Sequence, residues 1–363
     1  MLLARRVLLQ DKLRLLLSVV GVALAIMLVL ILGGFISGIN QQVGAYLENQ
    51  PGSIVVIQSG SQGANSVLPP GTVAAVAAEP GVERAIPVTY QWAILDLKDR
   101  KQFTYVIGYD RALGGGPWKL SVGREPSSDS EVVFDSVLAA RRGIGVGDGF
   151  DLMGRHFTIT GLSQGTTSWM ASYIFMRNSA ADQLYGMRGT SSYLLVTPDA
   201  GVSADELRTR LGQLPGVDAL AKTELVATQR RIYTSVFITP LELMAGIATL
   251  VGALVVGMVV YAATVERQRE YGMLKAVGAG NLVLYRVVGA QAVAAAVMGA
   301  VMGIGLAQGA GWLIMTLRPQ FLITIEPSSV AVALVTGLLM ALLAALWPAR
   351  LIARLAPAEV FRR

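Results

Sequence analysis

The residues with the clearest functional pattern form a short charged segment, ERQREYGMLKAVGAG, at positions 266–280. It lies between two long apolar runs, where so many charged side chains need a partner. On a helix the charged residues share one face, and Met273, Leu274 and Val277 form an apolar face. A helix of this form can press into a cleft on another protein. The chemistry it predicts is therefore recognition of a partner.

The alternative is an ordinary cytoplasmic loop that carries positive charge, as loops on that side of a membrane do. This positive-inside rule accounts for Lys and Arg, but it does not explain why Glu266 and Glu270 are interleaved with them. Gly278 and Gly280 then favour the end of a helix. The pattern therefore favours a docking helix over a plain basic loop.

The segment resembles the cytoplasmic coupling helix of FtsX/MacB-type ABC transporter permeases, which reads roughly E-R-x-x-E-[IY]-G-[IM]-L-[KR]-A-[LV]-G-A. Two further stretches, VGREPSSDSEVVFDSVLAARRGIGVGDGFDL (122–152) and FTITGL (157–162), resemble the extracytoplasmic core of the same family. The C-terminal WPARLIARLAPAEVFRR is similar to its closing motif. The residues that the resemblance assigns to ATPase coupling are Glu266, Arg267, Arg269, Glu270, Tyr271, Gly272, Leu274, Lys275 and Gly278.

The resemblance implies a type VII permease subunit, without catalytic residues of its own, that is driven by two copies of a separate ABC-type ATPase. ATP and Mg would bind in that ATPase, and no cofactor is expected in this chain. A second permease copy is expected, as a homodimer or alternatively a heterodimer. Membrane lipids, and an extracytoplasmic adaptor or effector protein as a further option, complete the expected partners.

Composition points independently to a membrane protein. Of the 363 residues, 53% are apolar and only 15% are charged, whereas soluble domains carry about 25% charged residues. A helix needs about 20 apolar residues to cross the hydrocarbon core. Four spans are predicted, near residues 15–37, 243–265, 287–312 and 328–348. The first is too long for the apolar part of a signal peptide, and no cleavage site of the A-x-A type follows it.

Charge asymmetry predicts the topology. Residues 40–235 hold 17 basic and 18 acidic residues, whereas the rest of the chain holds 13 basic and 6 acidic ones. Twelve of those 13 basic residues fall in three patches, before the first span, between the second and third, and after the fourth. The positive-inside rule places these patches in the cytoplasm. Both termini are then cytoplasmic in the bacterial cytoplasmic (inner) membrane, and the basic pI of 9.6 reflects lipid contact rather than nucleic acid.

The predicted fold class is an α-helical membrane protein, with four transmembrane helices and an α+β extracytoplasmic domain inserted between helices 1 and 2. Pro51-Gly52 is a strong stop after the first helix, and Pro240 is expected to kink the entry into the second span. The expected N-terminal parts are a cytoplasmic amphipathic helix (1–14), helix 1 with a stalk extension (15–50) and the MacB-like extracytoplasmic core (51–221). They are followed by the stalk with helix 2 (222–265) and the cytoplasmic coupling helix (266–280). Helix 3 (281–317), helix 4 (328–348) and a cytoplasmic tail (349–363) complete the chain as given.

Within the inserted domain, strands are predicted from runs of β-branched and aromatic residues. They lie at 54–58, 91–97, 102–108, 131–134, 156–162, 172–176 and 192–197. Helices are predicted at 71–81, 135–143, 179–186 and 203–214. The last two begin with Ser as cap, and the last reads S-x-x-E, a capping box. The mixture predicts an α+β domain in two lobes.

Several other sites are disfavoured by the sequence. It contains no G-x-x-x-x-G-K-[ST], so the chain has no P-loop of its own for ATP. No H-E-x-x-H occurs, and there is no Cys. The lone His156 is expected to be a surface strand residue, so no metal site is predicted. Gly299-x-x-x-Gly303 matches a close-packing motif, which would serve either a dimer face or packing inside one subunit.

Three functions compete. The first is an ATP-driven exporter or extractor of a hydrophobic or envelope substrate, acting by mechanotransmission. The second is a non-transporting regulator, similar to FtsX, that mechanically activates a cell-envelope hydrolase. The third is an ATP-independent membrane receptor, which the coupling segment disfavours. Exposed apolar groups in GTTSWMASYIFM (residues 165–176) would favour cargo handling.

Overall fold

The computed structural model describes residues 12–61, 63, 66–97, 100–168, 171–266, 273, 277 and 280–353. The chain divides into two compact units. The helical unit takes residues up to 38, 237–318 and those from 323 onward, and the sheet unit takes 39–236 and 319–322. The predicted N-terminal amphipathic helix falls almost wholly outside the described residues, as does most of the C-terminal tail.

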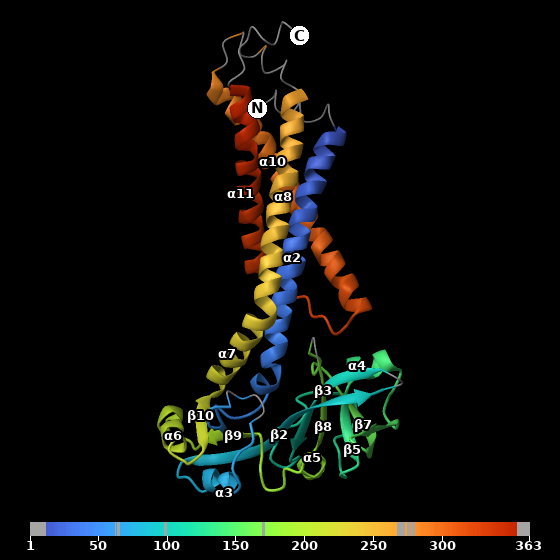
Figure 1. Cartoon of the computed structure of the whole chain (residues 1–363), viewed down its shortest axis with the longest axis vertical. Helices are drawn as coiled ribbons and strands as arrows, with labels where there is room; N and C mark the ends of the chain where they lie inside the picture. The colour runs from blue at the N-terminus through green and yellow to red at the C-terminus, as the bar shows by residue number, and fades with distance from the viewer. Residues whose placement is uncertain are drawn as a thin grey trace. The chain divides into compact units, whose positions relative to one another are not determined.

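Four long helices form the helical unit: α2 (Lys12–Glu48), α8 (Thr239–Glu266), α10 (Asn281–Leu317) and α11 (Pro327–Ala353) (Figure 1). Long runs of Ala, Leu and Val favour these helices, and α11 starts at a proline, whose fixed φ suits a first helical turn. α2 continues beyond the apolar window without a break and ends at Glu48, before Pro51.

The core of the helical unit pairs large side chains with small ones. Val22, Ile26 and Leu30 of α2 lie against alanines of the other helices: Ala296, Ala300, Ala307 and Ala333. Many other large apolar side chains of the unit instead point outward, with Leu243 68% exposed and Val301 69% exposed. In water such a surface would be unstable, whereas lipid tails cover it without cost. The pattern is that of a membrane protein.

Within the described part of the chain, three helical segments are long and apolar enough to cross a membrane. They are Val19–Glu48, Lys222–Val255 and Val293–Leu317. α11 adds a shorter apolar stretch, Pro327–Leu339, because its later residues are only partly described. Four spans therefore remain a prediction.

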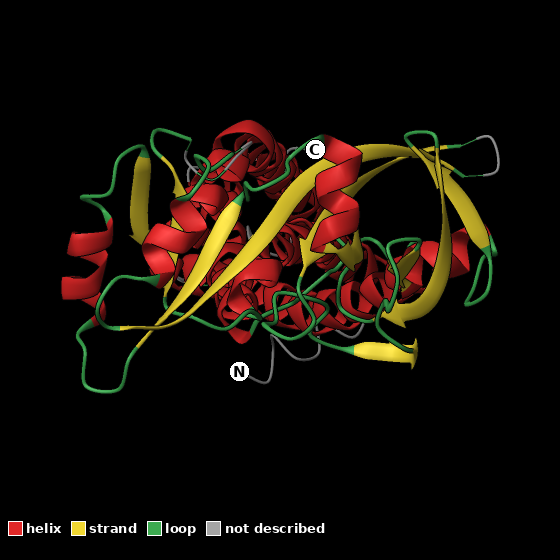
Figure 2. Cartoon of the chain, turned by 90° about the horizontal axis from the view of Figure 1, so that it is seen from below, coloured by secondary structure: helices red, strands yellow, loops and turns green. Residues whose placement is uncertain are grey.

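The described residues of the sheet unit form ten strands (yellow in Figure 2) in the order β10-β1-β9-β2-β3-β8-β5-β7-β4, with β6 paired to β7. Antiparallel pairs predominate, and β3–β8 and β5–β7 are parallel. The strands are β1 (Ile54–Gln58), β2 (Val82–Asp96), β3 (Lys101–Tyr109), β4 (Leu120–Gly123), β5 (Glu131–Asp135), β6 (Gly149–Leu152), β7 (Arg155–Ser163), β8 (Ser172–Arg177), β9 (Tyr193–Pro198) and β10 (Val217–Ala221).

The long strand β2 joins two lobes of this sheet. Its first half pairs with β9, as in Val88↔Tyr193, and its second half pairs with β3, as in Trp92↔Tyr105. The first lobe packs α3 (Thr72–Ala77) and α6 (Ala204–Leu211) on the sheet, and the second packs α4 (Ser136–Arg142) and α5 (Asn178–Tyr185). The predicted α+β domain with two lobes is confirmed.

A third apolar cluster lies on the opposite face of the sheet. Here the end of α2 and α7 (Lys222–Tyr233) cover strands of both lobes through Tyr46, Leu47, Leu225 and Val226. A Cβ added to Gly44 would lie 2.8 Å from Val226 Cγ1, so the two helices approach closely there. α7 is followed by a π-helical turn, Thr234–Ile238, before α8. This irregularity sits where Pro240 lacks an N–H for a regular helix.

Most predicted strands and helices of this unit lie within a residue or two of those observed. The strands β4, β6 and β10 were not predicted, β2 begins at Val82 rather than at 91, and two capping details were also wrong. Ser203 is at the N-cap of α6 but its side chain makes no capping hydrogen bond, and the N-cap of α5 is Arg177 rather than a serine. Ser179 instead donates to Asp129, because the tertiary contact outcompetes the local cap.

Candidate functional site: the coupling segment and a tyrosine-lined pocket

The predicted coupling segment connects α8, which ends at Glu266, to α10, which begins after its N-cap Gly280. Met273 and Val277 are its described interior residues, and Val277 N donates to Met273 O at 3.1 Å. Their side chains are 51% and 90% exposed. The other predicted coupling residues lie outside the described residues: Arg267, Arg269, Glu270, Tyr271, Gly272, Leu274, Lys275 and Gly278.

Gly299 and Gly303 lie where α10 meets α2 inside the helical unit. A Cβ on Gly299 would lie 2.5 Å from Val22 Cβ, and one on Gly303 would lie 2.7 Å from Ala23 O. Neither distance can be accommodated without moving the backbone. In this chain the motif therefore allows the close approach of two helices of one subunit.

In the sheet unit, polar contacts tie the end of α2 to the loop that follows β3. The Tyr46 hydroxyl donates to Gly115 O at 2.8 Å, and Gln50 Nε2 donates to Gly116 O at 2.9 Å. Tyr46 is buried, with only 2% of its surface exposed. These two hydrogen bonds attach this end of α2 to the sheet unit's loop after β3.

A second set of contacts ties the end of α2 to α7. Arg230 Nε donates to Asn40 O at 2.9 Å, and its guanidinium pairs with Glu48 at 2.8 Å. At the other end of α7, Lys222 Nζ donates to Gln50 O at 2.8 Å. The two helical segments are thus bound at both ends, and they form one structural element of the sheet unit.

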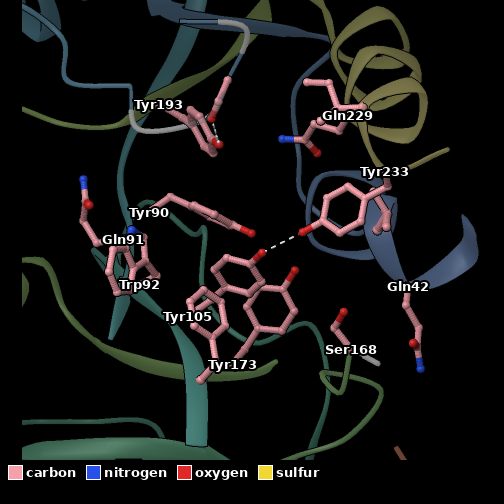
Figure 3. A pocket seen from close by; sticks show the side chains of 14 residues that line it. Gln42, Tyr90, Gln91, Trp92, Tyr105, Ser168, Tyr173, Tyr193, Gln229 and Tyr233 are labelled. Carbon is pink, nitrogen blue, oxygen red and sulfur yellow. Dashed lines mark hydrogen bonds between the residues drawn. The ribbon is translucent and has the colours of Figure 1, made fainter. Parts of the chain in front are cut away.

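A pocket of about 190 Å³ lies between the sheet and these two helical segments (Figure 3). Strands β2, β3, β8 and β9 contribute aromatic rings, and α7 contributes Gln229, Ile232 and Tyr233. The Tyr105 and Tyr233 hydroxyls are 2.8 Å apart and join the sheet to α7. The remaining lining residues are Gln42, Val43, Gly63, Tyr90, Gln91, Trp92, Phe103, Ser168, Tyr173 and Tyr193.

The electrostatics of the pocket are neutral. None of the described residues that line it carries a formal charge. Burial raises the pKa of Tyr90, Tyr173 and Tyr193 above the ordinary 10.0, so their hydroxyl groups keep their protons. The pocket therefore presents neutral hydrogen-bonding groups on a framework of packed rings, such as Tyr90 and Tyr105, whose centroids are 5.1 Å apart.

The stretch proposed for cargo handling is buried over its described part. Ala171, Tyr173, Ile174 and Phe175 are at most 3% exposed, because β8 is an inner strand of the sheet. Trp169 and Met170 lie outside the described residues. The described residues of this stretch therefore provide no exposed apolar surface for cargo.

The lone histidine is where the sequence predicted it. His156 lies on β7 with its side chain 68% exposed, and Nδ1 is 2.8 Å from Asp151. Among the described residues, no group of three or more His, Asp or Glu side chains could hold a metal ion.

Sequence reasoning missed the tyrosine-lined pocket. Its tyrosines come from β2, β3, β8, β9 and α7, and each was seen only as a strand or helix former. The available signal was weak: three of the predicted strands each contain one Tyr, and nothing in the sequence indicates that these side chains converge.

Two family profiles cover most of the chain. The MacB-like periplasmic core domain matches residues 15–214, and the FtsX-like permease C-terminal domain matches residues 242–357. The first alone covers more than half of the chain.

Relatives agree with these profiles. An uncharacterized ABC transporter permease of Mycobacterium tuberculosis is 25% identical over 304 residues, which is 82% of each chain. Another, of Mycobacterium bovis, is 26% identical over 329 residues, covering 89% of this chain and 88% of its own. The probable export ATP-binding/permease protein MacB of Pseudomonas entomophila is 33% identical over 123 residues, covering 34% of this chain and 18% of its own.

Among solved structures, the periplasmic region of MacB from Actinobacillus actinomycetemcomitans aligns with a TM-score of 0.39 at 13% identity, covering 50% of this chain and 94% of that one. The assignment therefore depends on the sequence profiles and the relatives, with which the apolar helices and the α+β unit agree. The chain belongs to the MacB/FtsX-like family of ABC transporter permeases.

Proposed function

We propose that this permease works with a separate ABC-type ATPase, which docks on the segment at 266–280. From that side of the membrane, the ATPase drives movements of the sheet unit on the opposite side. The observation that carries the proposal is the pair Met273 and Val277. These apolar side chains lie one helical turn apart, and both are exposed within the described chain. An exposed apolar turn between charged residues is suited to a partner protein's groove.

ATP binding is assigned to the partner because the sequence has no P-loop. The MacB relative is named as an ATP-binding/permease protein, and this chain matches only a minor part of its length. ATP and Mg would therefore be held by two ATPase copies, one for each of two permease copies. Two permease copies are proposed because four spans leave little room for an enclosed path.

The contacts within the sheet unit support transmission of movement. α7 and the end of α2 are bound to each other through Arg230, and α2 is bound to the sheet through Tyr46 and Gln50. A shift of these segments would therefore reposition strands rather than only bend a linker. The work would be spent on extraction or export of a hydrophobic or envelope substrate, outside the inner membrane.

The test replaces an apolar docking residue by a charge. Val277→Asp is the sharpest variant, because Val277 is 90% exposed and so contributes little to the fold of its own chain. Leu274→Asp is the companion variant within the same predicted apolar face. Truncation of a buried interface anchor costs about 2 kcal/mol or more, so both variants should lose co-purification with the ATPase and stimulation of ATP hydrolysis.

Arg267→Ala is the matched control, since a rim charge mainly affects the association rate and should weaken coupling only modestly. Yield and thermal midpoint of the permease should be unchanged in all three variants. If Val277→Asp and Leu274→Asp both keep full ATPase binding and stimulation, the segment is a basic loop and the proposal fails.

A further inference from the structure

The first half of α7 is held by packed side chains and by a charged group. Leu225 and Val226 are 0% and 3% exposed in the apolar cluster on this face of the sheet. Lys222 Nζ donates to Gln50 O at 2.8 Å, and α7 runs beside β1 and β10 of the first lobe. This half of α7 is therefore fixed to the first lobe and to the end of α2.

The C-terminal end of α7 is held in a different way. The hydroxyl of Tyr233 lies 2.8 Å from that of Tyr105, which belongs to β3 of the second lobe (Figure 3). Its neighbour Ile232 is 38% exposed and lines the tyrosine-lined pocket. At this end α7 thus reaches the second lobe through a hydrogen bond between two hydroxyls.

The pocket leaves space beside this hydrogen bond. Its volume of about 190 Å³ corresponds to about six water molecules, since one water takes about 30 Å³ in the liquid. A close-packed interior has few voids larger than one water. The end of α7 therefore has room to move relative to β3, whereas Leu225 and Val226 are tightly surrounded.

An irregular turn follows Tyr233 directly. Residues Thr234–Ile238 form the π-helical turn, and α8 begins at Thr239. Turns of this kind interrupt the regular hydrogen-bond ladder of a helix and are common points of bending. The hydroxyl pair, the space of the pocket and the irregular turn therefore coincide at one end of α7.

The strength of the contact suits a reversible one. A hydrogen bond between two hydroxyls changes an equilibrium by about 2- to 10-fold. The ring of Tyr105 is itself packed against Tyr90 and Tyr173, with centroids 5.1 and 5.4 Å away. Tyr105 is therefore a fixed point on the second lobe, and the end of α7 is the part that moves when the bond breaks.

We propose that the Tyr105–Tyr233 pair is a latch, which holds the C-terminal end of α7 on the second lobe and opens reversibly. In the latched state this end of α7 and the β2–β3 hairpin move together. In the open state it moves independently of the hairpin, while α7 stays bound to α2 and the first lobe. The use of the latch in transmission rests on the proposed function, but the latch itself belongs to the sheet unit and is measured without an ATPase.

The experiment measures distances by double electron–electron resonance on the full chain in lipid nanodiscs, without ATPase or ATP. The chain has no Cys, so spin labels attach only at introduced cysteines. Arg231→Cys on α7 is combined with Val122→Cys on β4 of the second lobe, or with Glu206→Cys on α6 of the first lobe. All three positions are exposed. Dilution with unlabelled chain restricts the signal to distances within one chain.

The parent should show one dominant distance for each labelled pair. Tyr233→Phe keeps the ring and removes the hydroxyl, so the α7-to-β4 pair should gain a second population, with the ratio of open to latched chains raised about 2- to 10-fold. Tyr105→Phe should have the same effect, and the double variant should add nothing, since all three lose one and the same hydrogen bond. The α7-to-α6 pair should keep its single distance.

Tyr109→Phe is the matched control, because its hydroxyl contacts Glu125 rather than α7, and both distance distributions should stay as in the parent. The proposal is overturned if neither latch variant changes the α7-to-β4 distribution, or if the control changes it as much. Equal broadening of both labelled pairs would show that all of α7 loosens, which also overturns a latch on the second lobe. The coupling variants do not enter this measurement, so the two proposals fail independently.

Discussion

The contact between α10 and α2 allows a sharp test of how the helical unit is packed. Gly299 faces α2, where an added Cβ would lie 2.5 Å from Val22 Cβ and 3.0 Å from Val19 O. Gly305, on the same helix, has nothing within 4 Å of its added Cβ. Gly299→Ala and Gly305→Ala are therefore the same chemical change at a packed and at an open position.

The expected magnitudes follow from two opposing effects. Replacing a helical Gly by Ala stabilises the helix by up to about 1 kcal/mol, and this gain is common to both variants. Overpacking at a tight contact costs about 1–3 kcal/mol, and only Gly299→Ala incurs it. The free energy of unfolding should therefore differ between the two variants by about 1–3 kcal/mol, with Gly305→Ala at or above the parent.

The assay is thermal unfolding of the purified chain in detergent, followed by fluorescence-detected size exclusion. For a chain of this size the difference corresponds to a separation of about 1–4 °C between the two midpoints. Gly303→Ala should behave like Gly299→Ala, since its Cβ would lie 2.7 Å from Ala23 O. Equal midpoints for Gly299→Ala and Gly305→Ala would refute the α2–α10 contact.

If Gly305→Ala were the more damaging substitution, the Gly-rich face of α10 would be contacting something outside the described chain, such as a second copy. Cross-linking across the dimer would then be the appropriate measurement. The comparison thus separates packing inside one subunit from packing between subunits.

Three further outcomes are expected. The Arg124 guanidinium lowers the pKa of Glu131 from 4.5 to about 2, so its contribution to stability is complete above pH 4.5 and is lost as the pH falls toward 2; Glu131→Gln should flatten this part of an acid-unfolding curve, and an unchanged curve would contradict the assignment. Asp135 is fully buried, and its carboxylate accepts hydrogen bonds from Leu138 N and from two threonine hydroxyls. Asp135→Ala should therefore lower the free energy of unfolding, measured by chemical denaturation, by about 2–4 kcal/mol. A decrease below about 1 kcal/mol would show that water replaces the carboxylate. The chain has no Cys, so Ser130→Cys should react with an impermeant thiol reagent on spheroplasts while Gly280→Cys should not, and the reverse pattern would invert the topology.

The sequence by itself determined the local elements and the family. The run IVVIQ at 54–58 became β1 with the predicted bounds, because consecutive β-branched residues favour an extended, buried strand. The apolar windows became long helices, since backbone groups in lipid must be satisfied within the segment. The charged segment between two apolar runs, together with the order of the core phrases, was enough to identify the permease family that the profiles then matched.

Other features depended on long-range pairing. β2 begins at Val82, well before the predicted 91–97, because its first half is held as a strand by pairing with β9 in spite of Pro87. The role of Gly299 and Gly303 required knowledge of which helix they face, and that helix lies near the other end of the chain.

The tyrosine-lined pocket shows the same limit most clearly. The pocket tyrosines come from five separate elements, and Tyr90 lies in the part of β2 that its neighbours alone did not predict: Tyr90, Tyr105, Tyr173, Tyr193 and Tyr233. Their convergence is set by the β2–β3 and β3–β8 registers and by the packing of α7, and a shift of one residue would turn each strand tyrosine to the other face. Local propensity determines which segments become strands and helices, and only tertiary packing decides which side chains share a cavity.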